Sequence, residues 1–599
     1  MLKRQRENKA GSNKSTVKGI GPTIRRIWSY LAGQRSLLIL VLLMVVASSA
    51  LGLLGPFLIG WGIDQYFATE SADGFTWLLI GLGAVYVMHS LTLWFQSYWM
   101  IGIAQKTVYI MRRQLFSHFH KLSIDFFNKR QHGELMSRVT NDIENVSATL
   151  NSSVIQIFSS VLTLAGTLAV MIWLSPLLTL VTMIIVPLMF MGMKWITSRT
   201  GKLYKEQQRR LGEMNGYIEE TISGQKIIKS FSQEPKVIEE FRIKNQQLKE
   251  SGYWAQTFTG FIPKLMNMLN NLSFTIVAGV GGFFALKGYV TIGTIVIFTE
   301  YSRQFTRPLN DLSNQFNTLL SAVAGADRVF DIIDTEEEAV DEKGAAPLLG
   351  ITGKVEFKDV SFSYEKGGDT VSDLNFNAEP GQTIALVGPT GAGKSTIINL
   401  ISRFYEPDQG MIMIDGHDSK KITRDSLRKQ MGFVLQDSFL FQGSIRENIR
   451  YGRLDASDEE VEKAARAANA HSFIQRLPEG YDTELSQDDA GISQGQKQLL
   501  SIARAILADP AILILDEATS SIDTITELKI QEALQHLLKG RTSFIIAHRL
   551  NTIKNADQII VIENGQIIEK GSHDELLAQK GFYHELYTSQ LEKKMLMNS

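Results

Sequence analysis

Long apolar runs separated by polar, charged segments fill roughly the first half of the chain. A helix rises about 1.5 Å per residue, so about 20 apolar residues cross a hydrocarbon layer of roughly 30 Å. Six runs predict membrane-spanning helices, at residues 36–63, 75–101, 154–174, 177–195, 261–286 and 290–304. The first half of the chain is therefore predicted to be an all-α transmembrane domain.

The distribution of lysine and arginine predicts how these spans are oriented, because positively charged loops remain in the cytoplasm. Segments 102–150 and 196–258 are rich in both residues, whereas segment 64–74 contains neither. The two basic segments and both termini are therefore predicted to be cytoplasmic, in a multi-pass protein of the cell membrane. Residues 1–35 are polar and basic, and the apolar run after them is too long for a cleavable signal peptide.

Polar residues interrupt the last two apolar runs. A charge at the bilayer centre costs about 2.5–3.5 kcal/mol on insertion scales, so such residues are expected to face protein or water. Either they line a water-filled cavity, or the two charged ones lie in the cytoplasmic part of a long helix. The residues concerned are Asn267, Asn270, Asn271, Glu300 and Arg303.

The two cytoplasmic segments are too long to be turns and keep a helical period, so the spans are predicted to continue beyond the bilayer. Each pair of extensions then closes at a short crosspiece. We expect the first crosspiece at residues 126–135 and the second near 215–221. Their distance from the membrane favours contact with the second half of the chain, although they could be simple helix connections.

An acidic stretch without apolar periodicity, residues 334–347, marks a domain boundary. Beyond Val355, short β-rich runs alternate with helical segments, which predicts an α/β domain. The predicted parts are a cytoplasmic N-terminal segment at 1–35, a transmembrane domain at 36–325, a linker at 326–350 and the α/β domain at 351–599.

Composition excludes several classes of site and partner. The net charge of −1 creates no field that would attract a polyanion, so no nucleic-acid partner is expected. The chain has no cysteine, which excludes disulfides, thiolate metal sites and cysteine nucleophiles.

A glycine-rich loop lies between the apolar run 383–387 and the helical run 397–400. This order of strand, loop and helix is the context in which G-x-x-x-x-G-K-[ST] indicates a polyphosphate site. The glycines let backbone N–H groups turn toward an anion, and Lys394 can then reach the β- and γ-phosphates of ATP. The Ser395 hydroxyl can ligate Mg²⁺. The residues of this loop are Gly388, Pro389, Thr390, Gly391, Ala392, Gly393, Lys394, Ser395 and Thr396.

A second apolar run, residues 511–515, ends in Asp516 and Glu517. Consecutive apolar residues predict a strand buried on both faces. We expect Asp516 to hold Mg²⁺ through water and Glu517 to orient or deprotonate the attacking water. In a chain that also contains the glycine loop, the pair predicts ATP hydrolysis.

Just before that strand stands Ile492-Ser493-Gln494-Gly495-Gln496, which is similar to the L-S-G-G-Q signature of the ABC transporters. With it, the chain resembles an ABC transporter of the exporter type over essentially its whole length. Other motifs follow the order of that family: Phe362-Ser363-Tyr364, Val434-Leu435-Gln436-Asp437, Ser520-Ser521-Ile522-Asp523 and Ala547-His548-Arg549.

The resemblance implies a role for each of these motifs. Tyr364 stacks on adenine, and Gln436 contacts Mg²⁺ or water and the crosspieces. Asp523 belongs to the D-loop, and His548 acts with Glu517 at the γ-phosphate.

The signature also predicts a second anion site. Ser493 stands at a predicted helix start, so its hydroxyl, the Gly495 N–H and the helix dipole can clamp an anion. The resemblance implies that this clamp, with Gln494 and Gln496, reaches the ATP of a second subunit. One chain with six spans and one ATP-binding domain resembles a half-transporter, which implies a dimer.

One departure from the family bears on the partner. The family has glycine at position 494, and the T-x-V-G-E-x-G pattern upstream has Gln487 and Asp489 in place of its glutamate and second glycine. The residues expected to hydrolyse ATP are intact. This mixture resembles the catalytically competent subunit of a heterodimeric bacterial exporter, and a homodimer that tolerates Gln494 is the alternative.

The resemblance implies ATP-driven export by alternating access. No charge cluster within the spans indicates an ionic substrate, and their methionine and phenylalanine content favours hydrophobic or amphipathic drugs or lipids. The alternatives are a homodimeric lipid or peptide exporter, an ATP-gated channel or another non-pumping membrane ATPase, and an importer of the same superfamily, although importers usually keep the two parts on separate chains.

Overall fold

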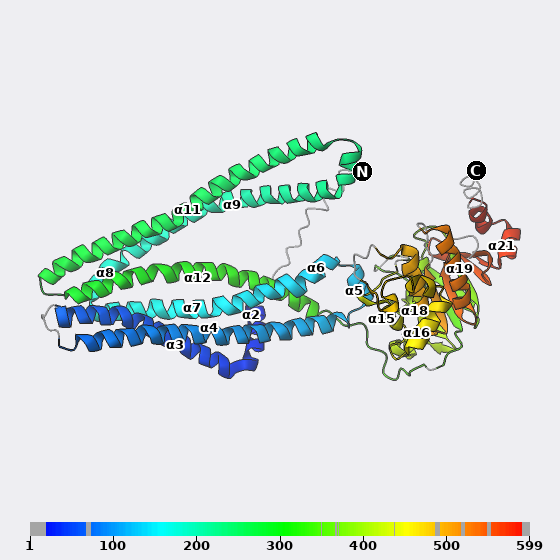
Figure 1. The fold of residues 1–599 in the computed structure, drawn as a ribbon, viewed down its shortest axis with the longest axis horizontal. Coiled ribbons are helices and arrows are strands. Elements are labelled where there is room, and N and C mark those ends of the chain that lie inside the picture. Colours follow the sequence, from blue (N-terminus) through cyan, green and yellow to red (C-terminus); the bar gives the residue numbers. More distant parts are fainter. Residues whose placement is uncertain are drawn as a thin grey trace. The chain divides into compact units, whose positions relative to one another are not determined.

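The computed structural model describes residues 20–67, 73–348, 350–365, 368, 370–436, 438–485, 491–516, 522–547 and 553–589 (Figure 1). The chain divides into two compact units. The first contains the chain up to Lys121 together with Gln131–Thr335. The second contains Glu336 onward together with the short segment Leu122–Arg130.

The first unit is built of helices, as the apolar pattern predicts. Within it α3 lies along α4, α7 along α12, and α9 along α11. Its helices are α2 (Ile20–Leu31), α3 (Arg35–Gly62), α4 (Phe75–Phe119), α6 (His132–Ser137), α7 (Ile143–Leu174), α8 (Pro176–Met183), α9 (Ile185–Ser223), α10 (Gln225–Ser230), α11 (Glu234–Leu286) and α12 (Ile292–Ile333).

Four helical stretches in the described residues are long and apolar enough to cross a membrane: Ile20–Phe67, Phe75–Phe119, His132–Leu174 and Glu234–Leu286. They contain four of the six predicted spans. The predicted span at 177–195 lies across the break between α8 and α9, where the apolar stretch is only Pro176–Leu188. The predicted span at 290–304 lies in α12, where Glu300 and Arg303 form an ion pair at 3.7 Å.

The second crosspiece is not where the sequence predicts it. Residues 215–221 lie inside α9, which continues to Ser223. The chain reverses at Gly224, the short helix α10, and Ser232, whose φ is +51°. The sequence pattern does not distinguish Gly224, where the helix ends, from Gly216, which is accommodated within α9.

A buried carboxylate joins α7 to α12 outside the predicted membrane spans. Asp142 is 3% exposed and accepts hydrogen bonds from Arg138 at 2.9 Å and from Arg328 at 3.0 Å. Burial raises the pKa of Asp142, but the hydrogen bonds and charges of the two guanidinium groups bring it below its ordinary value. α12 approaches closely here, because a Cβ on Gly325 would lie 3.2 Å from the Asp142 carbonyl oxygen.

The second unit is the predicted α/β domain, with a parallel core in its six-stranded sheet. That sheet has the order β12-β11-β3-β10-β9-β6, and an antiparallel sheet has the order β2-β1-β4-β5. The strands are β1 (Val355–Phe362), β2 (Val371–Ala378), β3 (Thr383–Val387), β4 (Gln409–Ile414), β5 (His417–Asp418), β6 (Met431–Val434), β7 (Gly443–Ser444), β8 (Glu484–Leu485), β9 (Ile512–Asp516), β10 (Thr542–Ile546), β11 (Gln558–Glu563) and β12 (Gln566–Gly571). The helices are α5 (Ile124–Asn128), α13 (Lys394–Ile401), α14 (Arg424–Lys429), α15 (Ile445–Arg450), α16 (Asp458–Ala467), α17 (His471–Ile474), α18 (Gln494–Ala508), α19 (Thr524–Leu538) and α21 (His573–Gln579).

The acidic stretch expected to be a linker packs on this second unit. Glu338 pairs with Arg428 at 2.6 Å, and Asp341 pairs with Arg424 at 2.9 Å. Its carboxylates therefore hold the start of the second unit against α14.

Part of the predicted first crosspiece, residues 126–130, belongs to the second unit, whereas residues 131–135 belong to the first. Its helix α5 presents Asn128, whose side-chain amide donates to the Tyr405 hydroxyl at 3.2 Å. The Phe126 ring is buried beneath Arg130, whose guanidinium lies 4.6 Å from the ring centroid.

Candidate functional site

The parallel strands bring the predicted ATP-binding segments to one edge of the sheet. In the pairing register, Ile546 of β10 lies beside Leu386 of β3 on one side and Asp516 of β9 on the other. Val434 of β6 lies beside Leu515. The glycine loop after β3, Asp516 and the segment that leads to Gln436 therefore share the carboxyl edge, where α/β sheets bind ligands.

The glycine loop has the backbone that a phosphate site requires. Gly391 and Gly393 have φ values of +85° and +107°, in the left-handed region that favours glycine. A Cβ on Gly393 would lie 2.6 Å from a methyl group of Val371, and one on Gly388 would lie 2.1 Å from the Ile562 carbonyl oxygen. These contacts leave room only for glycine at positions 388 and 393.

Lys394 begins α13 and folds back over the loop. Its Nζ donates to the carbonyl oxygens of Gly388 and Pro389, both at 2.8 Å. Burial lowers the pKa of Lys394, and the Asp516 carboxylate offsets only part of this effect. A buried ammonium that donates to carbonyl oxygens can exchange them for phosphate oxygens, with which it makes stronger charge-assisted bonds.

The residues predicted to hold Mg²⁺ supply hard oxygen donors. Ser395 is exposed in the first turn of α13, Asp516 ends β9, and Gln436 is exposed two residues beyond β6. Among the described residues, no three His, Cys, Asp or Glu side chains gather into a metal site. A hydroxyl, a carboxylate and an amide oxygen suit Mg²⁺, which in nucleotide sites also binds phosphate oxygens and water.

The remaining residues of the loop are distributed on both sides of it. Pro389 and Thr390 are exposed, whereas Ala392 and Thr396 are buried against the sheet.

Tyr364, predicted to stack on adenine, belongs to an aromatic cluster at the end of β1. Its ring meets those of Phe362 and Tyr405 edge-on, with centroids 5.0 and 4.9 Å apart. Its hydroxyl accepts a hydrogen bond at 3.0 Å from the side-chain amide of Asn399, on the helix that begins with Lys394. Tyr364 is therefore fixed to the phosphate-loop helix on one side and to Tyr405 on the other.

Tyr405 and Asn128 were not predicted from the sequence. Together with Tyr364 they connect the predicted adenine side of the site to α5, the first crosspiece. Tyr405 and Asn128 belong to no motif. The only sequence signal for their contact was the expectation that the first crosspiece meets the second half of the chain.

The signature begins a helix, as predicted. Ser493 caps α18: its hydroxyl accepts from the Gln496 N–H at 3.3 Å, and the Gln496 side chain accepts from the Ser493 N–H at 2.9 Å. Gly495 is buried, and a Cβ there would lie 2.5 Å from Thr526. Gln494 is exposed on the first turn, so its side chain stands where a glycine would leave the helix end open.

Asp523 caps the next helix, α19, by accepting from the Thr526 N–H at 3.0 Å. These backbone hydrogen bonds lower the pKa of Asp523. The signature and the D-loop thus meet at Thr526, which Gly495 contacts. The two residues predicted to be catalytic, Glu517 and His548, lie outside the described residues, as do Gln487 and Asp489.

A polar cavity lies between helices of the first unit. It has a volume of about 370 Å³ and is lined by residues of α3, α4, α7 and α12. Asp311 accepts from the Gln156 side chain at 2.8 Å, and Gln96 accepts from Ser48 at 3.2 Å. The lining residues are Ser48, Ser49, Gly52, His89, Leu93, Gln96, Ile155, Gln156, Ser159, Ser160, Thr163, Gln304, Pro308 and Asp311.

His89 and Asp311 place ionisable groups where the sequence indicated no charge cluster. They come from α4 and α12, so no local pattern joins them. The His89 ring makes no hydrogen bond to any described residue, and Gly52 gives it room, since a Cβ there would lie 3.4 Å from Nε2. Ionisable groups inside a membrane domain are costly and usually functional.

The fold and the site define a P-loop ATPase that shares its chain with a helical transmembrane unit. The family described as ABC transporter transmembrane region matches residues 38–309, and the family described as ABC transporter matches residues 371–520. The chain belongs to the ABC transporter family. It is a half-transporter of the exporter type, with ATP hydrolysis coupled to transport across a membrane.

Relatives match over nearly the whole chain. The chain is 65% identical over 588 residues to an ABC transporter ATP-binding protein of Bacillus subtilis (strain 168), YfiC, covering 98% of this chain and 97% of the relative. It is 40% identical to a fatty acid ABC transporter ATP-binding/permease protein of Mycobacterium bovis (strain ATCC BAA-935 / AF2122/97), covering 94% and 95%. It is 36% identical to an ATP-dependent lipid A-core flippase of Syntrophus aciditrophicus (strain SB), covering 90% and 89%.

Proposed function

We propose that this chain exports amphipathic compounds, drug-like or lipid-like, across the cell membrane by alternating access. The observation that carries the proposal is the polar cavity within a membrane unit that shares its chain with an ATPase. Relatives named for fatty acid transport, multidrug export and lipid A-core flipping support a cargo of this kind. The protein has six spans, with both termini in the cytoplasm.

ATP binds on the glycine loop, with Lys394 on its phosphates and Tyr364 against its adenine. Ser395, Asp516 and Gln436 would hold Mg²⁺, which would supply charge neutralisation at the phosphates. Glu517 orients the attacking water and accepts its proton, and His548 contacts the γ-phosphate.

The cavity favours a cargo with a cationic or hydrogen-bonding head. Asp311 supplies the fixed negative charge, while hydroxyl and amide groups supply further hydrogen-bond partners. The Ser49 hydroxyl is buried and lacks a partner among the described residues. Because unpaired polar groups in a low-dielectric site are costly, a cargo that satisfies them gains affinity.

A second subunit completes the transporter. The turn around α10 exposes Ile222, Ile227 and Phe231 at 70%, 62% and 70%. Apolar side chains this exposed at a helix hairpin tip support burial against a partner. The partner is a different half-transporter, because Gln494 gives this chain a weakened signature while its own ATP-binding residues are intact.

The test is export from cells that express the chain with and without a second half-transporter of the same organism. We expect a fluorescent cationic amphiphile to be exported faster than its neutral analogue, and Glu517→Gln to abolish export while ATP still binds. Asp311→Asn is expected to remove the preference for the cation. Glu300→Gln, which removes a charge from the same helix outside the cavity, is the matched control.

Two results would decide against the proposal. If Glu517→Gln turns over ATP at the wild-type rate, the assignment of the catalytic base is wrong. If the compound only equilibrates across the membrane and is never moved against a gradient, the protein gates a channel.

A further inference from the structure

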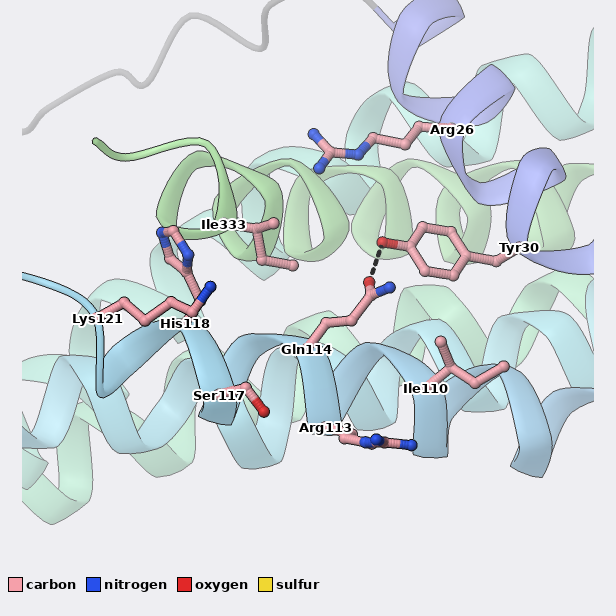
Figure 2. Close-up of a pocket in the computed structure, with 9 residues that line it drawn as sticks. All are labelled: Arg26, Tyr30, Ile110, Arg113, Gln114, Ser117, His118, Lys121 and Ile333. Carbon is pink, nitrogen blue, oxygen red and sulfur yellow. Dashed lines mark hydrogen bonds between the residues drawn. The ribbon is translucent and has the colours of Figure 1, made fainter. Parts of the chain in front are cut away.

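A larger cavity in the first unit differs from the polar one because its charged lining is basic. Its volume is about 620 Å³, and it lies between α2, the cytoplasmic part of α4 and the end of α12 (Figure 2). None of its described lining residues is a carboxylate. They are Arg26, Tyr30, Ile110, Arg113, Gln114, Ser117, His118, Lys121 and Ile333.

Contacts between its three walls make this a built site. The Tyr30 hydroxyl donates to Gln114 Oε1 at 2.7 Å, joining α2 to α4, as Figure 2 shows. Arg26 pairs with Asp334 at 2.6 Å and lies over the Phe330 ring, joining α2 to α12. His118 Nε2 lies 2.9 Å from the Thr335 carbonyl oxygen, which joins α4 to the residues after α12.

Donors remain for an anionic ligand. Asp334 already balances the charge of Arg26, whereas Arg113 makes no ion pair or hydrogen bond with any described residue. Gln114 uses its oxygen for Tyr30, which leaves its amide N–H groups for a ligand, and Ser117 adds a hydroxyl to the lining. A guanidinium, an amide and a hydroxyl together suit the oxygens of a phosphate.

The position of the cavity relates it to the membrane surface. Gln34 donates to the Ile103 carbonyl oxygen at 3.4 Å, so Ile103 is level with the start of the first predicted span. Ile110 follows seven residues later, roughly 10 Å along the helix, close to the headgroup layer. On its other face α2 exposes Ile20, Ile24 and Trp28, as a helix in a membrane interface does.

We propose that this cavity binds the phosphate of an anionic lipid from the cytoplasmic leaflet. A free phosphate anion has the same chemistry, but the apolar exposed face of α2 favours a ligand that comes from the membrane. A phosphate seated here binds donors of α4 in a cavity that α2 and the end of α12 also line, beside the helix that precedes the first span. Basic pockets on the cytoplasmic side of membrane helices bind such headgroups.

The test uses the full chain in neutral detergent, without ATP, so that transport and hydrolysis play no part. Phosphatidylglycerol and phosphatidylcholine are titrated separately while the melting temperature is followed. We expect saturable stabilisation by phosphatidylglycerol alone. The Arg113→Gln/Lys121→Gln variant is expected to weaken its apparent affinity by about fivefold for each charge removed.

The matched control is Lys106→Gln, which removes an exposed charge from α4 outside the cavity, nearer to the bilayer. If it weakens binding as much as the double variant does, the attraction is a general surface effect and the proposal fails. It also fails if the double variant responds as the wild type does. Inorganic phosphate is the remaining arm: equal stabilisation by phosphate would keep the anion site but overturn its assignment to lipid.

Discussion

At the scale of single residues, the glycine loop was predictable because its chemistry is contiguous. Each glycine, Lys394 and Ser395 lies within nine positions, and the strand and helix around them follow from local pattern. The Asn128–Tyr405 hydrogen bond was not predictable, because it joins residues 277 positions apart that share no motif. Side-chain contacts of that kind depend on packing, which sequence periodicity does not encode.

Lys394 leads to a prediction about pH. Its pKa is lowered by burial, so it loses its proton at a lower pH than an exposed lysine does. The protonated form binds phosphate, and ATP affinity is therefore expected to fall as the pH rises toward that lowered pKa. The loss of a charge-assisted contact corresponds to at least about tenfold weaker binding.

Titration of ATP binding between neutral and alkaline pH measures this effect. Lys394→Arg is the control, because a guanidinium stays charged over the whole range. If both proteins lose affinity in parallel, the alkaline loss does not come from Lys394.

At the scale of elements, the long helices followed from their apolar and polar runs, but the place where they reverse did not. The reversal between α9 and α11 lies at 224–233, whereas the sequence predicts it at 215–221. Two glycines stand in that region, and only the structure shows that Gly216 continues the helix and Gly224 ends it. The ambiguity is physical, since a glycine in a long, well-packed helix costs only about 1 kcal/mol.

The packing of α7 against α12 predicts a stability effect. Asp142→Asn removes the carboxylate between Arg138 and Arg328, and we expect a loss of about 2 kcal/mol. This is less than the 3–5 kcal/mol of a fully buried pair, because Arg328 keeps 35% of its side chain exposed.

The pH dependence of the same contact has a definite sign. Because the folded-state pKa of Asp142 is lowered, its stabilisation is complete above the unfolded-state pKa of about 3.9 and is lost as the pH falls below it. Thermal unfolding of the full chain in detergent measures both effects. Glu239→Gln, which breaks the exposed pair with Arg242, is the control and is expected to leave the melting temperature unchanged.

At the scale of the whole molecule, the two-unit architecture and the family were predictable from the order of motifs. The identity of the partner subunit was not. Gln494 is exposed at the first turn of α18, where the second subunit's ATP is expected to approach. Its side chain would occupy the space that a glycine leaves for a phosphate. Its effect therefore appears only in the assembled dimer.

We expect the chain purified alone to hydrolyse ATP slowly and to be activated by a second, different half-transporter. Gln494→Gly is expected to raise the ATPase activity of the chain alone several-fold. In a dimer of two such chains, each ATP site would face a consensus-like signature. Gln494→Ala keeps a Cβ, and its ATPase activity is expected to lie between that of the unmodified chain and that of Gln494→Gly. Steady-state ATPase assays decide the matter, and vigorous drug-stimulated turnover by the unmodified chain alone would favour the homodimer.

The segment Leu122–Arg130 matters when the chain is divided into its two units at the boundary before Glu336. A fragment that starts at Glu336 would carry Tyr405 but leave behind Asn128 and the buried Phe126 ring. The newly exposed surface would contain both apolar and polar groups that are normally covered, which favours aggregation. Supplying the nine-residue peptide in trans, or grafting it through a tether, is the natural remedy.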